Sequence, residues 1–331
     1  MVVGQRYSIG VIGAGELGSR HLQAIALVKE PLDVYVIDPN PQSLETAKSR
    51  WEEVAGDSKH NVYFEISMGC LSSKLMETVI IATDSKHRKS VIFELLSTVG
   101  GLKNLILEKV LFQKLQDYQE VEALLKNSDT KVFVNCPRRI IDIYKKIKGI
   151  IVDQPSIHID VVGNNWGLGC NGIHMVDIFS FFLNDDKLQI SWNDNGLDTE
   201  VLASTRANYS DFSGRLFGQT TNGSLSLTSF ATGEPNVSIR ITTAGYRIIM
   251  DEHRNVCSIE DMSNFSLEEQ PIDLKYQSNL TNLVIESLIH TSSCELTPYK
   301  ESMNLHLSFL SALLDHLPKI EGRKVEICPI T

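Results

Sequence analysis

The sequence of 331 residues lacks paired cysteine motifs and long hydrophobic runs. Its six cysteines are scattered, and none forms the C-x-x-C pattern of a zinc ribbon or a dithiol redox centre. We therefore expect reduced thiols and no metal site. No apolar stretch approaches the roughly 20 residues that span a bilayer, and the N-terminal apolar stretch lacks the basic segment of a signal peptide. These absences predict a cytoplasmic protein with no membrane partner.

Basic charge is also scarce. The 31 Lys and Arg against 41 Asp and Glu give a formal net charge of −10. Nucleic-acid binding needs a basic face, so this balance argues against a nucleic-acid partner. The 42% hydrophobic and 22% charged residues are typical of a globular protein. At roughly 150 residues per domain, the length predicts about two domains.

The pattern of hydrophobic residues changes near residue 137. Before that point, short apolar strands alternate with helical segments, which is typical of a parallel sheet covered on both faces. Beyond it, helical patterns over 140–147, 173–183 and 281–317 flank a run of strands and turns over 188–275. The sequence predicts an α/β domain over residues 1–137. It predicts an α+β domain with a mainly antiparallel sheet over residues 138–331.

A glycine-rich turn links the first predicted strand to the first predicted helix. Its residues 13–18, GAGELG, match the G-x-G-x-x-G fingerprint. Gly13 permits a tight turn, Gly15 lets the backbone approach a pyrophosphate, and Gly18 lets helix and strand pack closely. Glu16 and Leu17 complete the fingerprint, which opens a helix with helical spacing from Gly18, and the free N–H groups at the start of that helix face the phosphates. The pattern predicts a Rossmann domain that binds a dinucleotide, and a glycine turn in another α/β protein is the alternative.

The residue that ends the second predicted strand indicates which cofactor is bound. Asp38 lies 20 residues after Gly18, where a carboxylate accepts hydrogen bonds from the adenosine ribose. It is followed by Pro39 and Asn40, so no guanidinium is at hand for a 2′-phosphate, which the carboxylate would repel. We therefore expect NAD in preference to NADP.

Nearly the whole chain resembles the Gfo/Idh/MocA family, named for glucose–fructose oxidoreductase and inositol dehydrogenase. Residues 107–111, LEKVL, resemble its Glu-Lys-Pro signature, with Val110 in place of proline. Residues 81–83, IAT, followed by His87, resemble its Thr-Pro-Asn…His stretch. Residues 171–177, NGIHMVD, resemble its Gly-x-His-x-x-Asp helix, and residues 222–224, NGS, resemble a turn of its C-terminal sheet. The resemblance implies a Rossmann domain followed by an open-faced antiparallel sheet, through which members often form homodimers or homotetramers.

The resemblance also implies a reaction. Members exchange hydride between a nicotinamide and a carbinol carbon, often of a sugar, and the hydroxyl proton must be removed as hydride leaves. By position, Lys109 binds the reacting hydroxyl and His174 acts as acid and base. Thr83, His87 and Glu108 are expected beside the cofactor. The implied partner is a small sugar-like substrate.

Other polar residues are candidates for holding that substrate. Asn165 and Asn171 carry amides that bind sugar hydroxyls, and the indole of Trp166 either stacks on a sugar or fills an interface between domains. Arg138 and its neighbour Arg139 suit an anionic substrate, although only one of the two is expected to face the site. A further carboxylate, Asp177, lies on the helix face of His174 and either orients that histidine or braces the helix.

One position departs from the family. Many members carry an aspartate four residues before the histidine, where this chain has Cys170. A neutral thiol cannot relay a proton as a carboxylate does. This cysteine is expected to be either a small buried residue or a nucleophile. The leading hypothesis is an NAD(P)-dependent oxidoreductase acting on a sugar, sugar derivative or polyol. A cofactor-binding regulator without turnover and a reductase of C=N or C=C bonds are the alternatives.

Overall fold

The computed structural model describes residues 5–56, 58–185 and 188–331, which form two compact units. Unit 1 contains the residues up to Phe112, Gln116–Pro137 and Lys275–Tyr299. Unit 2 contains Gln113–Leu115, Arg138–Leu274 and Lys300–Thr331. The sequence pattern had placed 275–299 in the second domain. The structure corrects this, because that segment packs on the first helix of unit 1 and adds a short strand to its sheet.

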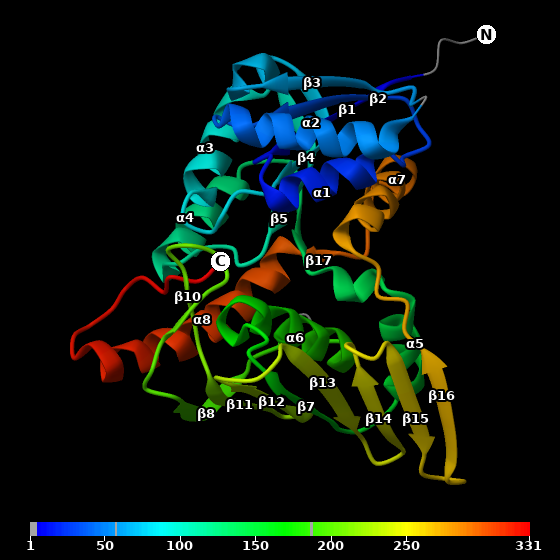
Figure 1. Ribbon diagram of the computed structural model, residues 1–331, viewed down its shortest axis with the longest axis vertical. Helices are drawn as coiled ribbons and strands as arrows, with labels where there is room; N and C mark the ends of the chain where they lie inside the picture. Colours follow the sequence, from blue (N-terminus) through cyan, green and yellow to red (C-terminus); the bar gives the residue numbers. More distant parts are fainter. Residues whose placement is uncertain (1–4, 57, 186–187) are drawn as a thin grey trace. The chain divides into compact units, whose positions relative to one another are not determined.

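Unit 1 is built on a seven-stranded sheet in the order β17-β6-β5-β4-β1-β2-β3 (Figure 1). The strands are β1 (Tyr7–Ile12), β2 (Leu32–Ile37), β3 (Asn61–Glu65), β4 (Leu75–Ile81), β5 (Gly101–Glu108), β6 (Lys131–Asn135) and β17 (Thr297–Pro298). The helices are α1 (Glu16–Ile25), α2 (Pro41–Ala55), η1 (Met68–Leu71), α3 (Arg88–Thr98), α4 (Leu115–Leu125), η3 (Gln277–Asn279) and α7 (Thr281–Thr291). All pairings are parallel except that of β17 with β6.

The strand order 3-2-1-4-5-6 is that of the Rossmann fold. Strand β4 is buried at every position after Leu75, so other elements pack on both of its faces, as expected for a central strand of a parallel sheet. In such a sheet the ligand lies beyond the carboxyl ends of the strands, next to the point where the strand order reverses between β1 and β4. The glycine-rich turn follows β1 at that point. The predicted Rossmann architecture is confirmed.

Unit 2 carries an eight-stranded sheet in the order β16-β15-β14-β13-β7-β12-β11-β8, and a small β10-β9 pair. The strands are β7 (Ile157–Asn164), β8 (Ser191–Leu197), β9 (Leu202–Ala203), β10 (Ser210–Asp211), β11 (Gly214–Thr220), β12 (Gly223–Phe230), β13 (Asn236–Thr242), β14 (Tyr246–Asp251), β15 (Val256–Asp261) and β16 (Ser266–Pro271). The helices are η2 (Pro137–Ile140), α5 (Asp142–Ile151), α6 (Leu168–Leu183) and α8 (Tyr299–Glu321). Only β7 and β12 pair in parallel, so the mainly antiparallel sheet is confirmed.

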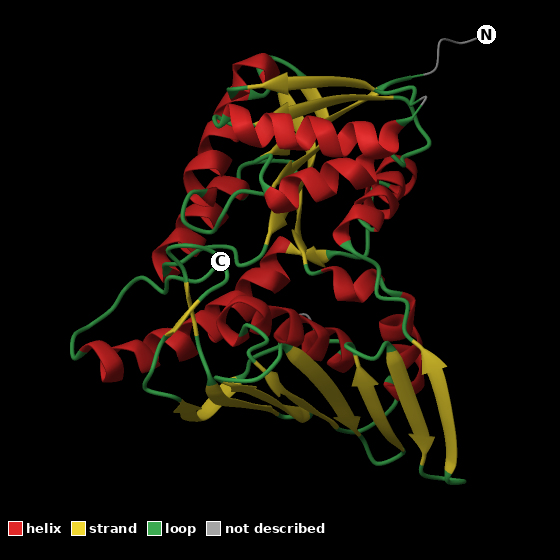
Figure 2. Ribbon diagram, in the orientation of Figure 1, coloured by secondary structure: helices red, strands yellow, loops and turns green. Residues whose placement is uncertain are grey.

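The sheet of unit 2 has one covered and one open face. Along β7 buried and exposed residues alternate, so that Ile159 and Val161 face inward while Asp160 and Val162 face outward. This period of two is expected for a sheet packed on one side only. Helices α5, α6 and α8 lie on one face, and within the described residues no helix covers the other (Figure 2).

The helical stretch predicted over 281–317 is interrupted. Residues Thr297–Pro298 form β17 and pair with β6, so the stretch divides into α7 and α8. The predicted helix over 173–183 begins earlier, at Leu168. Among the residues that the structure describes, no helix combines the length and the apolar character needed to cross a bilayer.

Candidate functional site

The three glycines of the turn differ in what surrounds them. Gly13 has a φ of +91°, and a Cβ built on it would lie 2.9 Å from the backbone nitrogen of Thr83. A Cβ on Gly18 would lie 1.7 Å from the carbonyl oxygen of Gly13. A Cβ on Gly15 would meet no atom within 4 Å. The first and third glycines thus serve packing, while the second borders open space.

The N-terminus of α1 opens onto that space. Gly15 is the residue that caps the helix, and no side chain accepts a hydrogen bond there. The first-turn N–H groups of a helix have no partner inside the helix and carry its positive dipole end. Asp38 fixes the turn from the end of β2, because its carboxylate accepts from the backbone N–H of Ala14 at 2.7 Å and of Asn40 at 2.8 Å.

A cavity of about 590 Å³ adjoins this helix terminus. Its lining comes from residues at and just beyond the carboxyl ends of β1, β2, β3 and β4 and from α3. The residues are Ile12, Gly13, Gly15, Ile37, Asp38, Pro39, Ile66, Ser67, Met68, Ala82, Thr83, Asp84, His87, Ser90, Val91 and Glu94. The buried hydroxyl of Thr83 has no hydrogen-bond partner within the described chain. His87 borders the cavity with its Nδ1 hydrogen-bonded to Asp84 at 2.8 Å. The cavity, the open space at Gly15 and the unsatisfied hydroxyl all fit a dinucleotide.

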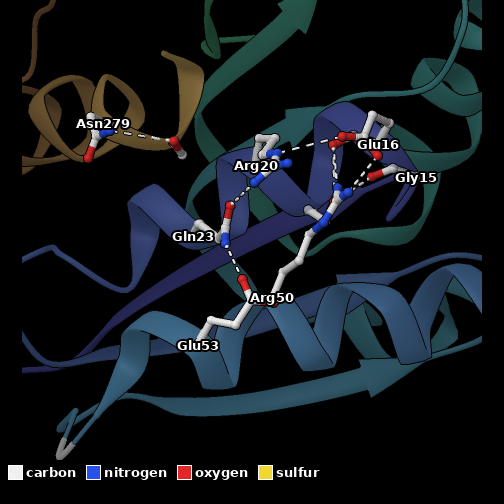
Figure 3. Close-up of polar contacts among 9 residues, drawn as sticks. Gly15, Glu16, Arg20, Gln23, Arg50, Glu53 and Asn279 are labelled. Atoms are coloured by element: carbon white, nitrogen blue, oxygen red, sulfur yellow. Dashed lines mark hydrogen bonds and ion pairs between the residues drawn. The ribbon is translucent and has the colours of Figure 1, made fainter. Parts of the chain in front are cut away.

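Glu16 turns its side chain to arginines beside the turn (Figure 3). Its carboxylate accepts from Arg50 Nη2 at 2.6 Å and lies 3.6 Å from Arg20 Nε. The hydrogen bond from Arg50 lowers the pKa of Glu16 below its usual value. Glu16 and Leu17 form the first turn of α1. The backbone N–H of Glu16, in this first turn, has no partner inside the helix and can donate to a cofactor phosphate.

A buried polar network holds the end of β5. Glu108 is 2% exposed and accepts hydrogen bonds from Asn135 and from His21, whose Nε2 lies 2.9 Å from the carboxylate. On its other side, His21 Nδ1 lies 2.8 Å from the Thr281 hydroxyl. Burial alone would raise the pKa of Glu108, but the hydrogen bond and charge of His21 outweigh it and leave the pKa below its usual value. Glu108 therefore braces the strand end from inside the unit.

Lys109 follows this anchored glutamate and is half-buried. The peptide bond to Val110 is cis, and the carbonyls of Val110 and Leu111 both accept hydrogen bonds from the buried guanidinium of Arg88. Sequence reasoning missed Arg88 and His21. For His21 the available signal was a titratable side chain with Leu17, Ala24 and Ile25 one helical turn away. Arg88 lies between His87 and Lys89, and the sequence gives no such signal for it.

In unit 2, helix α6 is buried along nearly its whole length. Its half-buried positions before Phe181 are Cys170, Asn171 and His174. Cys170 and His174 are four residues apart and thus share one face of the helix. Cys170 Sγ lies 3.7 Å from the Ser204 hydroxyl. The helix therefore presents a thiol, an amide and an imidazole where the rest of its surface packs into the core.

The segment before α6 is held within the unit. Trp166 is 7% exposed, and its indole N–H donates to the carbonyl of Thr228 at 2.8 Å. The amide of Asn171 donates in turn to the carbonyl of Trp166 at 2.8 Å. Asn165 is exposed and has a φ of +41°. The indole thus packs inside unit 2, and Asn165 is the exposed polar side chain of this segment.

The two arginines after β6 are both engaged in ion pairs. Arg138 donates to Glu252 through Nε at 3.1 Å and Nη2 at 2.8 Å, and Nε also donates to Tyr144. Arg139 pairs with Asp177 at 2.8 Å and with Glu301 at 2.6 Å. Arg138 was expected to bind an anionic substrate, and in this structure its guanidinium is held by the carboxylate of Glu252 in its own unit. Asp177, being 1% exposed and paired with Arg139, braces α6.

The fold and the cavity together define a dinucleotide-binding Rossmann protein. Residues 7–136 match the Gfo/Idh/MocA model, described as an oxidoreductase family with an NAD-binding Rossmann fold. This match places the Rossmann domain in that family and confirms the resemblance seen in the sequence. Among curated proteins, none matches the chain significantly.

Solved structures share the fold over nearly the whole chain. UDP-N-acetylglucosamine 3-dehydrogenase GnnA from Acidithiobacillus ferrooxidans is 14% identical, with a TM-score of 0.66 over 93% of this chain and 97% of that one. The 3-ketoreductase KijD10 from Actinomadura kijaniata, in complex with NADP, is 13% identical, with a TM-score of 0.68 over 93% of this chain and 96% of that one. A super-repressor mutant of Gal80p from Saccharomyces cerevisiae is 12% identical, with a TM-score of 0.70 over 95% of this chain and 97% of that one. At these identities the likeness shows the fold alone.

Proposed function

We propose that the protein is a nicotinamide-dependent oxidoreductase that moves hydride to or from a carbinol carbon of a sugar, sugar derivative or polyol. The observation that carries this proposal is the cavity at Gly15, with an uncapped helix terminus at one side and the unsatisfied Thr83 hydroxyl in its wall. The family of residues 7–136 supports the same cofactor class. The cofactor, when bound, supplies the hydride acceptor or donor.

The chain's own residues then handle the proton. Lys109 binds the reacting hydroxyl, and the anchored Glu108 limits how far the strand end that carries Lys109 can move. His174 takes up or returns the hydroxyl proton, since an imidazole exchanges protons near neutral pH. Cys170, one turn before His174, supplies no carboxylate, so the imidazole carries the proton transfer without the acidic partner found in many relatives.

A cofactor-binding regulator is the second candidate. Two features favour it, namely Cys170 and Val110, because both replace residues of motifs that carry the chemistry in the family. The similarity in fold to a super-repressor mutant of Gal80p supports the same candidate. A reductase of a C=N or C=C bond is the third, and it requires little of His174.

A turnover screen tests the proposal. The protein is incubated with NAD and a panel of sugars, polyols and sugar nucleotides, and absorbance at 340 nm reports reduced cofactor. Lys109→Ala and His174→Ala are each expected to lower kcat by about 100-fold. The Kd for NADH is expected to change by less than about threefold, because the glycine turn is untouched. Cofactor binding without turnover on the whole panel, with variants that alter only Kd, would instead support the regulator.

Cofactor preference is a separate prediction. The described cavity lining contains Asp38, Asp84 and Glu94 but no lysine or arginine, so a 2′-phosphate would meet negative charge there. We expect NADH to bind about tenfold or more tightly than NADPH, measured by fluorescence titration. Asp38→Asn keeps a side-chain oxygen that accepts the hydrogen bond from the Ala14 N–H and removes the negative charge. This variant should therefore reduce the ratio of the affinity for NADH to the affinity for NADPH. Glu52→Gln is the matched control, because Glu52 is exposed on α2 and lies outside the described cavity lining, so it should leave the preference unchanged. Equal affinities for NADH and NADPH in the unaltered protein would contradict the prediction.

A further inference from the structure

The buried guanidinium of Arg88 joins two segments of unit 1. Arg88 is the first residue of α3 and is 1% exposed. Its Nη1 donates to the carbonyls of Val110 and Leu111, the latter at 2.9 Å, and its Nη2 donates to the carbonyl of Thr83. One side chain therefore connects the segment that follows β4 with the segment that follows β5.

Both of these segments belong to the candidate site. The backbone of Thr83 lies against the glycine turn, because a Cβ built on Gly13 would lie 2.9 Å from the Thr83 nitrogen. Thr83 also lines the cavity that fits a dinucleotide. On the other segment, Lys109 directly precedes Val110. All of these residues belong to unit 1, so contacts continue from the glycine turn through Thr83 and Arg88 to the backbone beside Lys109.

The location of Arg88 is unfavourable for a positive charge. A guanidinium in the first turn of a helix meets the positive end of the helix dipole, and burial removes the water that would hydrate it. An arginine nevertheless offers five N–H donors in a rigid fork, which can hold carbonyls of two segments at the same time, whereas a lysine donates from a single point. The benefit of an arginine here is therefore geometric, since it fixes the distance between the two segments.

We propose that Arg88 is a positioning residue that sets the place of Lys109 relative to the bound dinucleotide. This inference rests on the proposed function, in which Lys109 binds the reacting hydroxyl beside the cofactor. The dinucleotide lies against the glycine turn and Thr83, and Arg88 holds the backbone next to Lys109 at a fixed distance from that wall. Glu108 is anchored by His21 and Asn135 on the other side of Lys109, so this lysine lies between two held neighbours.

Pulse labelling of lysines with acetic anhydride, followed by mass spectrometry of peptides, tests the inference without a substrate. In the unaltered full chain, saturating NADH should slow the labelling of Lys109 by about fivefold or more, because a covered amine reacts only when the site opens. Arg88→Lys keeps the charge but holds one segment at most. This variant should bind NADH with a Kd within about threefold of the unaltered value, since the glycine turn is untouched. NADH should then slow the labelling of Lys109 by less than about twofold, because the lysine is no longer held beside the cofactor.

Turnover gives a second measurement with any substrate that the sugar screen identifies. Arg88→Lys should lower kcat by about 100-fold, since a displacement of about 1 Å at a reacting group has an effect of that size. The Kd for NADH should stay nearly unchanged in the same variant. A loss confined to kcat separates the placing of Lys109 from a general loss of the cofactor site.

Arg6→Lys is the matched control. Arg6 also belongs to unit 1 and also donates to carbonyls of two segments, those of Leu32 and Lys59, but it lies at the amino ends of the strands. Urea unfolding compares the stability that each variant loses. Arg6→Lys should leave both kcat and the effect of NADH on the labelling of Lys109 as they are in the unaltered protein.

The inference is overturned if NADH slows the labelling of Lys109 equally in Arg88→Lys and in the unaltered protein, or if Arg6→Lys removes the slowing as well. Arg88→Gln buries no charge and replaces Arg88→Lys should that variant be unfolded. Unfolding of both, while Arg6→Lys folds, would assign Arg88 to stability alone and also overturn the inference. An unaltered protein that binds no NADH would overturn the proposed function together with this inference, whereas NADH binding without any slowing at Lys109 would overturn the inference alone.

Discussion

Gly15→Ala is expected to lower the affinity for NADH by about 100-fold or more while leaving the protein folded. The backbone at Gly15 has φ −63° and ψ −160°, which alanine adopts without strain, and the added methyl group meets no protein atom within 4 Å. That methyl group instead occupies the space through which a pyrophosphate approaches the helix terminus. Fluorescence titration with NADH measures the loss, and thermal unfolding should show a change within about 0.5 kcal/mol.

The comparison with Gly18→Ala makes this prediction specific. At Gly18 the new Cβ would lie 1.7 Å from a backbone oxygen, so α1 must move away from the turn. We expect a loss of about 2 kcal/mol or more in the free energy of unfolding together with the loss of NADH binding. If Gly15→Ala bound NADH as tightly as the unaltered protein, the dinucleotide would not lie against this turn, and the proposed function would fail.

Glu108→Ala is expected to lower the free energy of unfolding by about 3–5 kcal/mol. The truncation leaves Asn135 and His21, which is 1% exposed, without their buried acceptor. Lys103→Ala is the matched control on the same strand, because it removes an ion pair with Glu77 in which the lysine is 69% exposed. That pair should contribute less than about 1 kcal/mol. Urea unfolding followed by circular dichroism measures both.

The same carboxylate predicts a dependence on pH. The pKa of Glu108 is lower in the folded than in the unfolded chain, so its contribution to stability is complete above the unfolded pKa. It declines as the pH falls from about 4.3, the usual value for glutamate, through the folded pKa. Glu108→Gln keeps the shape but has no carboxylate to titrate. The stability difference between the unaltered protein and Glu108→Gln should therefore be largest near neutral pH and shrink below pH ~4, and a constant difference would contradict this account.

Much of the architecture follows from local patterns. Alternation of apolar strands with helical segments predicted the Rossmann domain, and the spacing of Gly13, Gly15, Gly18 and Asp38 predicted the turn and its carboxylate. These features depend on residues close together in the chain, so the sequence contains them directly. The resemblance carried by Lys109 and His174 indicated the family, which the match over 7–136 confirms for the Rossmann domain. Self-association through the sheet and cytoplasmic location stay predictions.

Contacts between distant residues were decided only by the tertiary structure. Nothing near Arg138 in the sequence shows that Glu252, 114 residues later, holds its guanidinium. In the same way, the hydroxyl of Thr281 is hydrogen-bonded to His21, which lies 260 residues earlier in the chain. The segment that contains Thr281 belongs to the Rossmann unit and not to the second domain. A charged side chain has the same local pattern whether it is paired in the core or available to a ligand, because its free energy depends on which groups the fold brings beside it. The sequence by itself therefore determined the cofactor turn and the order of elements, whereas only the packed structure decided that Arg138 and Arg139 are paired with carboxylates of their own unit.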